Sequence, residues 1–158
     1  MRRALFALLL LLPEPLSAQR YVFVPRIQPE VRVEAVMARR LSGLVMGGAN
    51  VPLGMYVRAG AAVGAGVADA ENGAVLAMRT DVTLRFLLDP FAENAWGPYA
   101  GGGLTVRRDG TERSRAGVLL VLGVEGRRAR RWAPAVEVAL GEGVRLAVVL
   151  RKKRTNGR

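Results

Sequence analysis

The residues of this chain that could do chemistry are its carboxylates and its arginines, because the sequence contains no cysteine and no histidine. This composition excludes a disulfide framework, a thiol nucleophile, a Ser-His-Asp triad and a zinc finger, each of which needs a soft ligand or a base that titrates near neutral pH. The sequence also offers no adequate set of metal ligands. We therefore expect no metal, no other cofactor and no enzymatic activity.

Two carboxylates, Glu125 and Glu137, are the best candidates for a catalytic pair, since they are expected on the same face of two adjacent strands. Two close carboxylates can share the roles of general acid and general base. Arginines expected on the same face, such as Arg79, Arg85 and Arg145, give a simpler explanation, because a buried carboxylate needs an opposite charge. We interpret both glutamates as structural partners of arginine.

The elements that must position these groups are β-strands, because apolar residues recur with a period of two. Between Ala74 and Leu88 the even positions are apolar except for Thr80, and the odd positions include Arg79 and Asp81. A period of two sends the two sets to opposite faces of a strand. The same alternation recurs in residues 114–127, 132–140 and 144–151.

Turn signals, of which Asn72-Gly73 is the strongest, divide the chain into pieces of strand length. Strands are predicted at residues 30–39, 42–50, 54–69, 74–88, 98–108, 114–127, 132–140 and 144–151. Eight sequential strands with short connections predict an all-β fold, an up-and-down antiparallel sheet. Closing that sheet into an eight-stranded barrel removes the exposed edge at each end.

The N-terminus has the pattern of an export signal. Arg2 and Arg3 precede the apolar run Ala4–Leu12, and small residues before Gln19 suit cleavage. The run is shorter than the roughly 20 apolar residues that span a bilayer as a helix. We therefore predict a signal peptide at 1–18, an extended leader at 19–29, the barrel at 30–151 and a basic C-terminal tail at 152–158. Cleavage would lower the formal charge from +11 to +10.

Whether the apolar face of the strands points into the barrel or out of it distinguishes two possible functions. In a soluble, lipocalin-like periplasmic barrel the apolar face lines a cavity for a small apolar ligand, whereas in a membrane barrel that face meets lipid. Three features favour the membrane barrel: the polar faces are rich in Gly and Ala, their charges nearly balance, and the opposite faces carry no charge over whole strands. The charged residues expected to form an ion-pair network in the lumen are Arg32, Glu34, Arg58, Arg79, Asp81, Arg85, Glu125, Glu137 and Arg145.

A resemblance to a known family rests on three features of the sequence. They are the cleavable leader, the eight short strands, and the run from Trp96 to Leu104 followed by a Glu-bearing penultimate strand. Over residues 30–151 the chain resembles the small outer-membrane β-barrel proteins of Gram-negative bacteria. The resemblance implies a monomeric barrel in the outer membrane, with a role in adhesion or envelope stability rather than a fixed activity. The soluble periplasmic barrel remains the alternative.

Basic and aromatic residues gather near the expected strand ends. A basic rim is predicted at Arg127, Arg128, Arg130, Arg131, Arg151, Lys152, Lys153 and Arg154, and further arginines cluster at 39–40, 107–108, 113 and 115. Such a rim suits anionic lipid or lipopolysaccharide phosphates, although a simple solvated surface also explains it. Nucleic acid is not expected as a partner. The aromatic residues expected to form interfacial girdles are Tyr56, Phe86, Phe91, Trp96, Tyr99 and Trp132.

Overall fold

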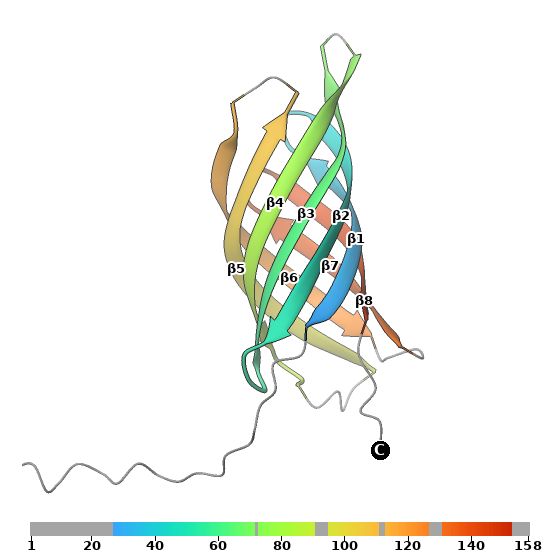
Figure 1. The fold of residues 1–158 in the computed structure, drawn as a ribbon, viewed down its shortest axis with the longest axis vertical. Coiled ribbons are helices and arrows are strands. Elements are labelled where there is room, and N and C mark those ends of the chain that lie inside the picture. Colours follow the sequence, from blue (N-terminus) through green and yellow to red (C-terminus); the bar gives the residue numbers. More distant parts are fainter. Residues whose placement is uncertain (1–26, 72, 91–94, 111–112, 127–130, 153–158) are drawn as a thin grey trace, which may run out of the picture.

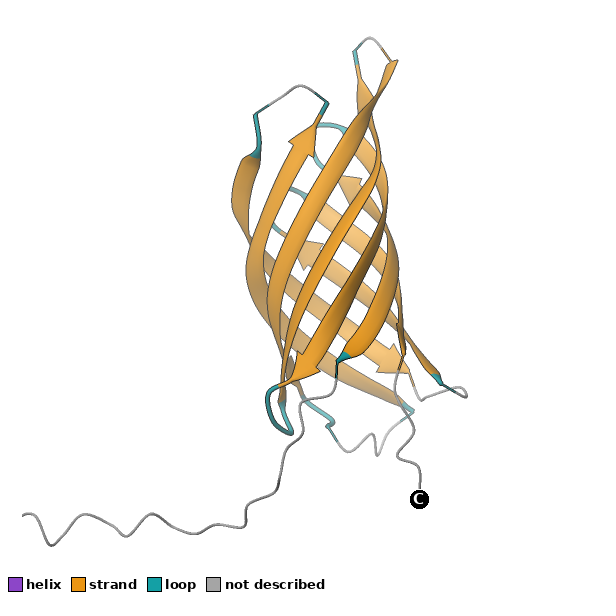
Figure 2. Ribbon diagram, in the orientation of Figure 1, coloured by secondary structure: helices purple, strands orange, loops and turns teal. Residues whose placement is uncertain are grey.

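The computed structural model describes residues 27–71, 73–90, 95–110, 113–126 and 131–152. Its strands are β1 (Gln28–Met37), β2 (Leu41–Pro52), β3 (Val57–Ala70), β4 (Gly73–Leu87), β5 (Trp96–Asp109), β6 (Arg115–Gly126), β7 (Trp132–Leu140) and β8 (Val144–Lys152). The described part of the chain is strand and connection throughout, with no helix (Figure 2). The predicted signal peptide, most of the leader and the end of the basic tail lie outside the described residues.

The eight strands form one closed antiparallel barrel, which confirms the predicted fold class (Figure 1). Each strand pairs with the next along the chain, and β8 returns to pair with β1. That closing seam runs from Glu30 opposite Arg151 to Met37 opposite Val144. Closure satisfies the backbone hydrogen bonds of both terminal strands, so neither is left as an edge.

The observed strand bounds differ from the predicted ones by a few residues. The largest shift is at β3, which starts at Val57 instead of residue 54. The amide of Leu53 donates to the carbonyl of Val57 at 2.9 Å, and this bond closes a turn over the intervening residues. At the predicted Asn72-Gly73 turn, Gly73 has a φ of 112°, a conformation that glycine adopts without strain.

The strand faces are inverted relative to a soluble barrel. Leu84, Leu120 and Val138 point outward with 47%, 58% and 40% of their surface exposed, whereas Arg79 and Arg145 are only 3% and 4% exposed. Exposed and buried positions alternate along β8, where the exposed residues up to Leu150 are apolar and the buried ones are Arg145, Ala147, Val149 and Arg151. The face of the sheet that carries the charged residues therefore lines the interior, and the apolar face points outward.

The interior also contains apolar side chains, which fill the space beside the charges. Leu119 and Val121 of β6 and Leu44 and Met46 of β2 are each at most 2% exposed. They belong to two buried clusters that include inward alanines from several strands. The small side chains let the long arginines of the facing strands cross the lumen.

The two ends of the barrel differ. β1, β3, β5 and β7 begin at the lower end in Figure 1, where β2, β4, β6 and β8 end. At the upper end β1, β3, β5 and β7 end and the other four strands begin, and the β3–β4 hairpin projects furthest there. We call these the terminus end and the mouth end.

Candidate functional site

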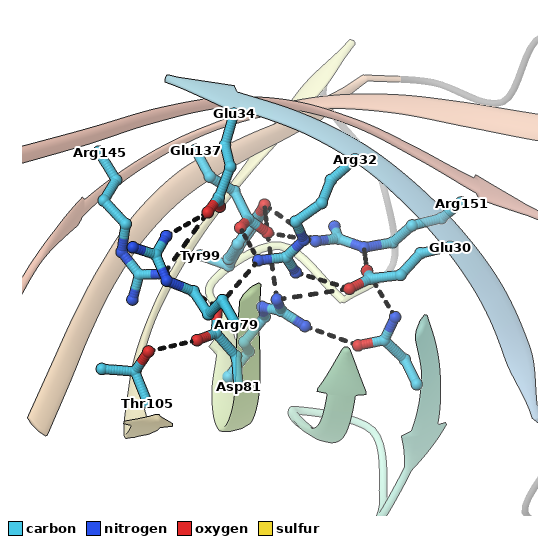
Figure 3. Close-up of polar contacts among 12 residues, drawn as sticks. Glu30, Arg32, Glu34, Arg79, Asp81, Tyr99, Thr105, Glu137, Arg145 and Arg151 are labelled. Atoms are coloured by element: carbon cyan, nitrogen blue, oxygen red, sulfur yellow. Dashed lines mark hydrogen bonds and ion pairs between the residues drawn. The ribbon is translucent and has the colours of Figure 1, made fainter. Parts of the chain in front are cut away.

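The candidate site is the charged interior of the barrel, where side chains from all of the strands converge (Figure 3). The structure places all nine of the predicted lumen residues inside, each 8% exposed or less. It adds others that belong to the same hydrogen-bonded system, and we call the whole set the interior network. Its members are Glu30, Arg32, Glu34, Asn50, Arg58, Arg79, Asp81, Arg85, Tyr99, Thr105, Glu125, Glu137, Arg145 and Arg151.

Arg151 of β8 is the centre of the network near the terminus end. Its Nε donates to Glu30 Oε2 at 2.9 Å and its Nη1 to Glu125 Oε2 at 2.7 Å. Its Nη2 donates to Glu137 Oε1 and, at 3.1 Å, to the Tyr99 hydroxyl. Each nitrogen of this one guanidinium therefore has a partner, and three carboxylates from different strands are tied to β8.

Tyr99 packs against that guanidinium and shares its carboxylate. The ring centroid lies 5.0 Å from Arg151 Cζ, and the hydroxyl donates to Glu137 Oε1 at 2.7 Å. A cation above an aromatic face gains electrostatic energy, more when both groups are desolvated. The phenol thus positions both partners of a buried ion pair.

Arg32, Arg85 and Asn50 extend the network from Glu30. Arg32 Nη2 donates to Glu30 Oε1 at 2.6 Å, and Asn50 Nδ2 donates to Glu30 Oε2 at 2.7 Å. Arg85 Nη1 in turn donates to Asn50 Oδ1 at 2.6 Å. The Asn50 amide therefore links a carboxylate to an arginine across the barrel. Arg58 Nη1 donates at 2.8 Å to Glu125 Oε2, the oxygen that also accepts from Arg151 Nη1.

A second group lies nearer the mouth end. Arg145 Nη1 and the Thr105 hydroxyl donate to the two oxygens of Asp81, at 3.0 and 2.6 Å. Arg79 donates to Glu34, which Arg145 also approaches to 3.9 Å. Arg32 joins the two groups, because its Nη1 lies 3.9 Å from Asp81 Oδ2 and 3.5 Å from Glu137 Oε2. The ion pairs therefore form one connected system along the barrel axis.

Two glycines make room for these contacts. A Cβ at Gly60 would lie 2.5 Å from Asn50 Oδ1 and 2.9 Å from Arg85 Nη1, and one at Gly123 would lie 2.4 Å from Tyr99 Cζ. Gly123 is directly opposite Tyr99 in the β5–β6 register, and the ring occupies the space that a side chain at Gly123 would need. This explains Gly60 on the inward face of β3 and Gly123 on that of β6.

The arrangement is suited to holding charge rather than to reacting. Glu125 and Glu137, the pair considered for acid–base chemistry, each accept hydrogen bonds from Arg151, and Glu125 also accepts one from Arg58. Among the described residues, no group of carboxylates could hold a metal ion. Buried charges persist only when they are paired, and here the strands supply those pairs.

One predicted rim residue is corrected by the structure. Arg151 was expected at the basic rim, but it is fully buried in the lumen. The reason is that side chains two residues apart on a strand point to the same side. Arg151 is six residues after the inward Arg145 on β8, so it also points inward, and it lies opposite Glu30 at the seam. Lys152 and Arg131 do lie at the terminus end with exposed side chains. The other rim residues, Arg127, Arg128, Arg130, Lys153 and Arg154, lie outside the described residues.

Two further placements differ from the sequence expectations. Tyr99 was expected in an outer aromatic girdle but is 2% exposed and points inward. Arg107 was grouped with basic residues outside the strand interiors, yet it is 5% exposed, and its Nε donates to Asp109 at 2.8 Å. Both errors arose because the two residues were assigned from their position near a strand end, which does not show whether a side chain points inward or outward. Glu30 was missed, although its phase with Arg32 and Glu34 would have identified it.

The comparison with one solved structure supports this architecture. Neisserial surface protein A superposes with a TM-score of 0.62 at 12% sequence identity, over 81% of this chain and 96% of that protein. The fold is shared. The attachment invasion locus protein Ail of Yersinia pestis aligns with a TM-score of 0.41 at 9% identity, over 79% of this chain and 93% of Ail. The predicted resemblance to Gram-negative outer-membrane barrels is confirmed at the level of the fold.

Neither a known protein family nor a curated protein sequence matches the chain. Among the described residues, no helix is long and apolar enough to cross a membrane.

Proposed function

We propose that the chain is a non-enzymatic outer-membrane β-barrel protein, a monomeric envelope scaffold whose lumen is filled by its own side chains. The observation that carries this proposal is the inverted facing of the strands. Apolar residues such as Leu84, Leu120 and Leu146 are exposed on the outer wall, while the arginines and carboxylates are inside. An outer wall of this kind is costly in water and favourable against acyl chains.

The lengths of the strands support the same location. β7 and β8 each have 9 residues and β1 has 10. A transmembrane strand needs about 9–11 residues when it is tilted at about 45°. The strands in Figure 1 are strongly tilted, so even the shortest of them are long enough to cross the hydrocarbon layer.

The exposed aromatic residues support one orientation in the membrane. Tyr56, Phe86, Trp96 and Trp132 are between 42% and 53% exposed, and all of them lie near the terminus end. Aromatic rings favour the boundary between headgroups and acyl chains. We propose that this belt marks the periplasmic interface, which leaves the mouth end at the cell surface.

The basic rim fits that periplasmic boundary. Arg131 and Lys152 are exposed close to Trp132, which is opposite Lys152 in the β7–β8 register. Cations beside an aromatic belt can contact anionic headgroups. Because the predicted export signal would remove the chain from the cytoplasm, nucleic acid is not proposed as a partner.

Adhesion is a second candidate role. One solved structure of similar fold is a surface protein, as its name states, and another is named for attachment and invasion. The connections at the mouth end are short, with the β3–β4 hairpin as the projecting feature. A scaffold is therefore the better supported role, and adhesion would have to use that hairpin.

The soluble lipocalin-like alternative is disfavoured by what lines the lumen. The space that an apolar ligand would need is occupied by buried charges such as Arg85 and Glu137, each at most 2% exposed. An apolar molecule there would have to displace ion pairs in a region of low dielectric, which is costly.

Fractionation of cells that express the full chain tests the location. We expect the mature protein in the outer-membrane fraction, extractable only with detergent, and faster migration on a gel for the unheated than for the heated sample. Recovery in the soluble periplasm without detergent would refute the membrane proposal. A cytoplasmic fraction with the first 18 residues intact would refute export.

A further inference from the structure

The connection between β2 and β3 is an apolar turn at the terminus end of the barrel. It comprises residues 53–56, and we call it the β2–β3 turn. Its exposed side chains are Leu53, Met55 and Tyr56, with 57%, 57% and 53% of their surface accessible. The sequence has no charged residue from Val51 to Val57, whereas every other stretch between two strands contains at least one. This turn therefore exposes apolar surface that no charge interrupts.

The turn continues the apolar outer wall of the barrel. One position beyond the last β2–β3 ladder pair, the Leu53 amide donates to the Val57 carbonyl at 2.9 Å. Leu53 is in phase with the exposed Val45 of β2, so its side chain lies on the outer side of the sheet. Val57 is in turn opposite the exposed Phe86 of β4. The apolar wall thus extends across three strands and past the end of β2.

This apolar extension is confined to one side of the terminus end. Exposed cations, Arg131 and Lys152, lie at the same end but beside β7 and β8. In the closed barrel three strands separate β3 from β7 in either direction, so the turn and these cations are on opposite sides. Apolar side chains favour acyl chains and cations favour headgroups. The side with the turn is therefore suited to lie deeper in lipid than the side with the cations.

We propose that the β2–β3 turn is a lipid anchor, whose side chains enter the boundary between headgroups and acyl chains in the leaflet at the terminus end. The occupant is lipid because the surface of the turn is continuous with the outer wall, which faces acyl chains in the function proposed above. Removal of Leu53 and Met55 from water is favourable, and the ring and hydroxyl of Tyr56 suit such a boundary. A charged side chain costs far less there than at the middle of a bilayer.

The anchor rests on the proposed membrane location and adds to it a contact that sets how deep one side of the barrel lies. Lipid quenching of a fluorescent label tests it. The chain has no cysteine, so a single introduced cysteine takes the label alone. The full mature chain with Met55→Cys would carry an environment-sensitive dye. It would be folded into phosphatidylcholine vesicles that contain lipid brominated near the headgroup end of the acyl chains.

Two reference labels calibrate the measurement. Leu84→Cys, on the outer wall, reports insertion of the barrel, and Glu71→Cys, exposed at the β3–β4 hairpin, reports contact with water. We expect the label at Met55→Cys to be quenched at least about half as strongly as that at Leu84→Cys, because the interfacial boundary lies beside the brominated chains. The label at Glu71→Cys should be hardly quenched.

A second set of variants tests whether the apolar side chains hold the turn in lipid. Leu53→Ser/Tyr56→Ser should lower the quenching at Met55→Cys at least about twofold, because it removes apolar surface from the turn. The matched control is Met37→Ser/Leu41→Ser, which changes two exposed apolar residues that pair at the mouth end and should leave that quenching unchanged. Quenching at Leu84→Cys should be the same in both backgrounds, as expected of a barrel that stays inserted.

Failure of the anchor and failure of the membrane location give different results. Absence of quenching at Leu84→Cys would refute the membrane location, and the anchor with it. Strong quenching at Leu84→Cys, with Met55→Cys quenched no more than Glu71→Cys, would overturn the anchor alone and leave the turn as a contact for a protein. Quenching at Met55→Cys that is unchanged in Leu53→Ser/Tyr56→Ser would also overturn it, because those side chains would then not hold the turn in lipid.

Discussion

Glu30 and Arg151 lie opposite each other at the seam that closes the barrel, and Arg151 Nε donates to Glu30 Oε2 at 2.9 Å. The first and last strands are thus joined by backbone pairing and by a buried ion pair between residues far apart in the sequence. Because the same guanidinium also holds Glu125 and Glu137, the seam is tied to β6 and β7 as well. This contact is where closure of the sheet and the interior network meet.

Removal of Arg151 should therefore destabilise the barrel strongly. Arg151→Met keeps much of the side-chain volume but leaves three carboxylates without this partner, and breaking a buried pair costs about 3–5 kcal/mol. The free energy of unfolding in urea, followed by gel migration of unheated samples, measures the loss. Lys152→Met, the exposed neighbour, is the control and should change stability by less than about 0.5 kcal/mol. Equal effects would remove the network from the account of stability.

The outward facing of the apolar residues predicts where a charge blocks insertion. Leu84→Arg and Leu120→Arg should each cost about 2–4 kcal/mol at the middle of a bilayer and reduce the folded, membrane-inserted fraction. Leu53→Arg is the matched control, because Leu53 is exposed at a turn beyond the strand ends. Folding yield into lipid vesicles is the measurement. Three equal yields would contradict the facing described here.

The contact between Tyr99 and Gly123 predicts a steric defect. Gly123→Ala would place a methyl group 2.4 Å from Tyr99 Cζ, which has to shift, and overpacking of this kind costs about 1–3 kcal/mol. Gly47→Ala, where no atom lies within 4 Å, is the control for a glycine in an exposed strand position. In the double variant Gly123→Ala/Tyr99→Leu, the cost of the added methyl should largely disappear. Additive losses would show that the two positions do not interact.

The filled lumen predicts that the barrel does not conduct ions. An eight-stranded barrel has an interior only wide enough for side chains, and here arginines and carboxylates occupy it together with Leu119 and Val121. In planar lipid bilayers the protein should give no stepwise currents, whereas a larger porin used as the positive control should. Steady single-channel steps from the purified chain would contradict a filled interior.

Much of the fold could be read from local pattern. The period of two in β4, β6, β7 and β8 predicted both the strands and their facing, because adjacent residues of a strand point to opposite sides whatever lies next to them. The inward position of Glu137 and Arg145 followed from the same rule. It also applied to Glu30 and Arg151, which proximity to the strand ends obscured.

What only the tertiary structure decided is which charge meets which. The pairing of Arg58 with Glu125 and the location of Tyr99 over Gly123 depend on the register and closure of strands far apart in the sequence. A one-residue slip of one strand would change these partners, and no local pattern sets the alignment of distant strands. The sequence by itself therefore determined that charged side chains line the interior and apolar side chains cover the outer wall, because the side of a strand to which a residue points depends only on its position in that strand. Which charged residues pair with each other depends on strands far apart in the sequence, and only the closed barrel determines it.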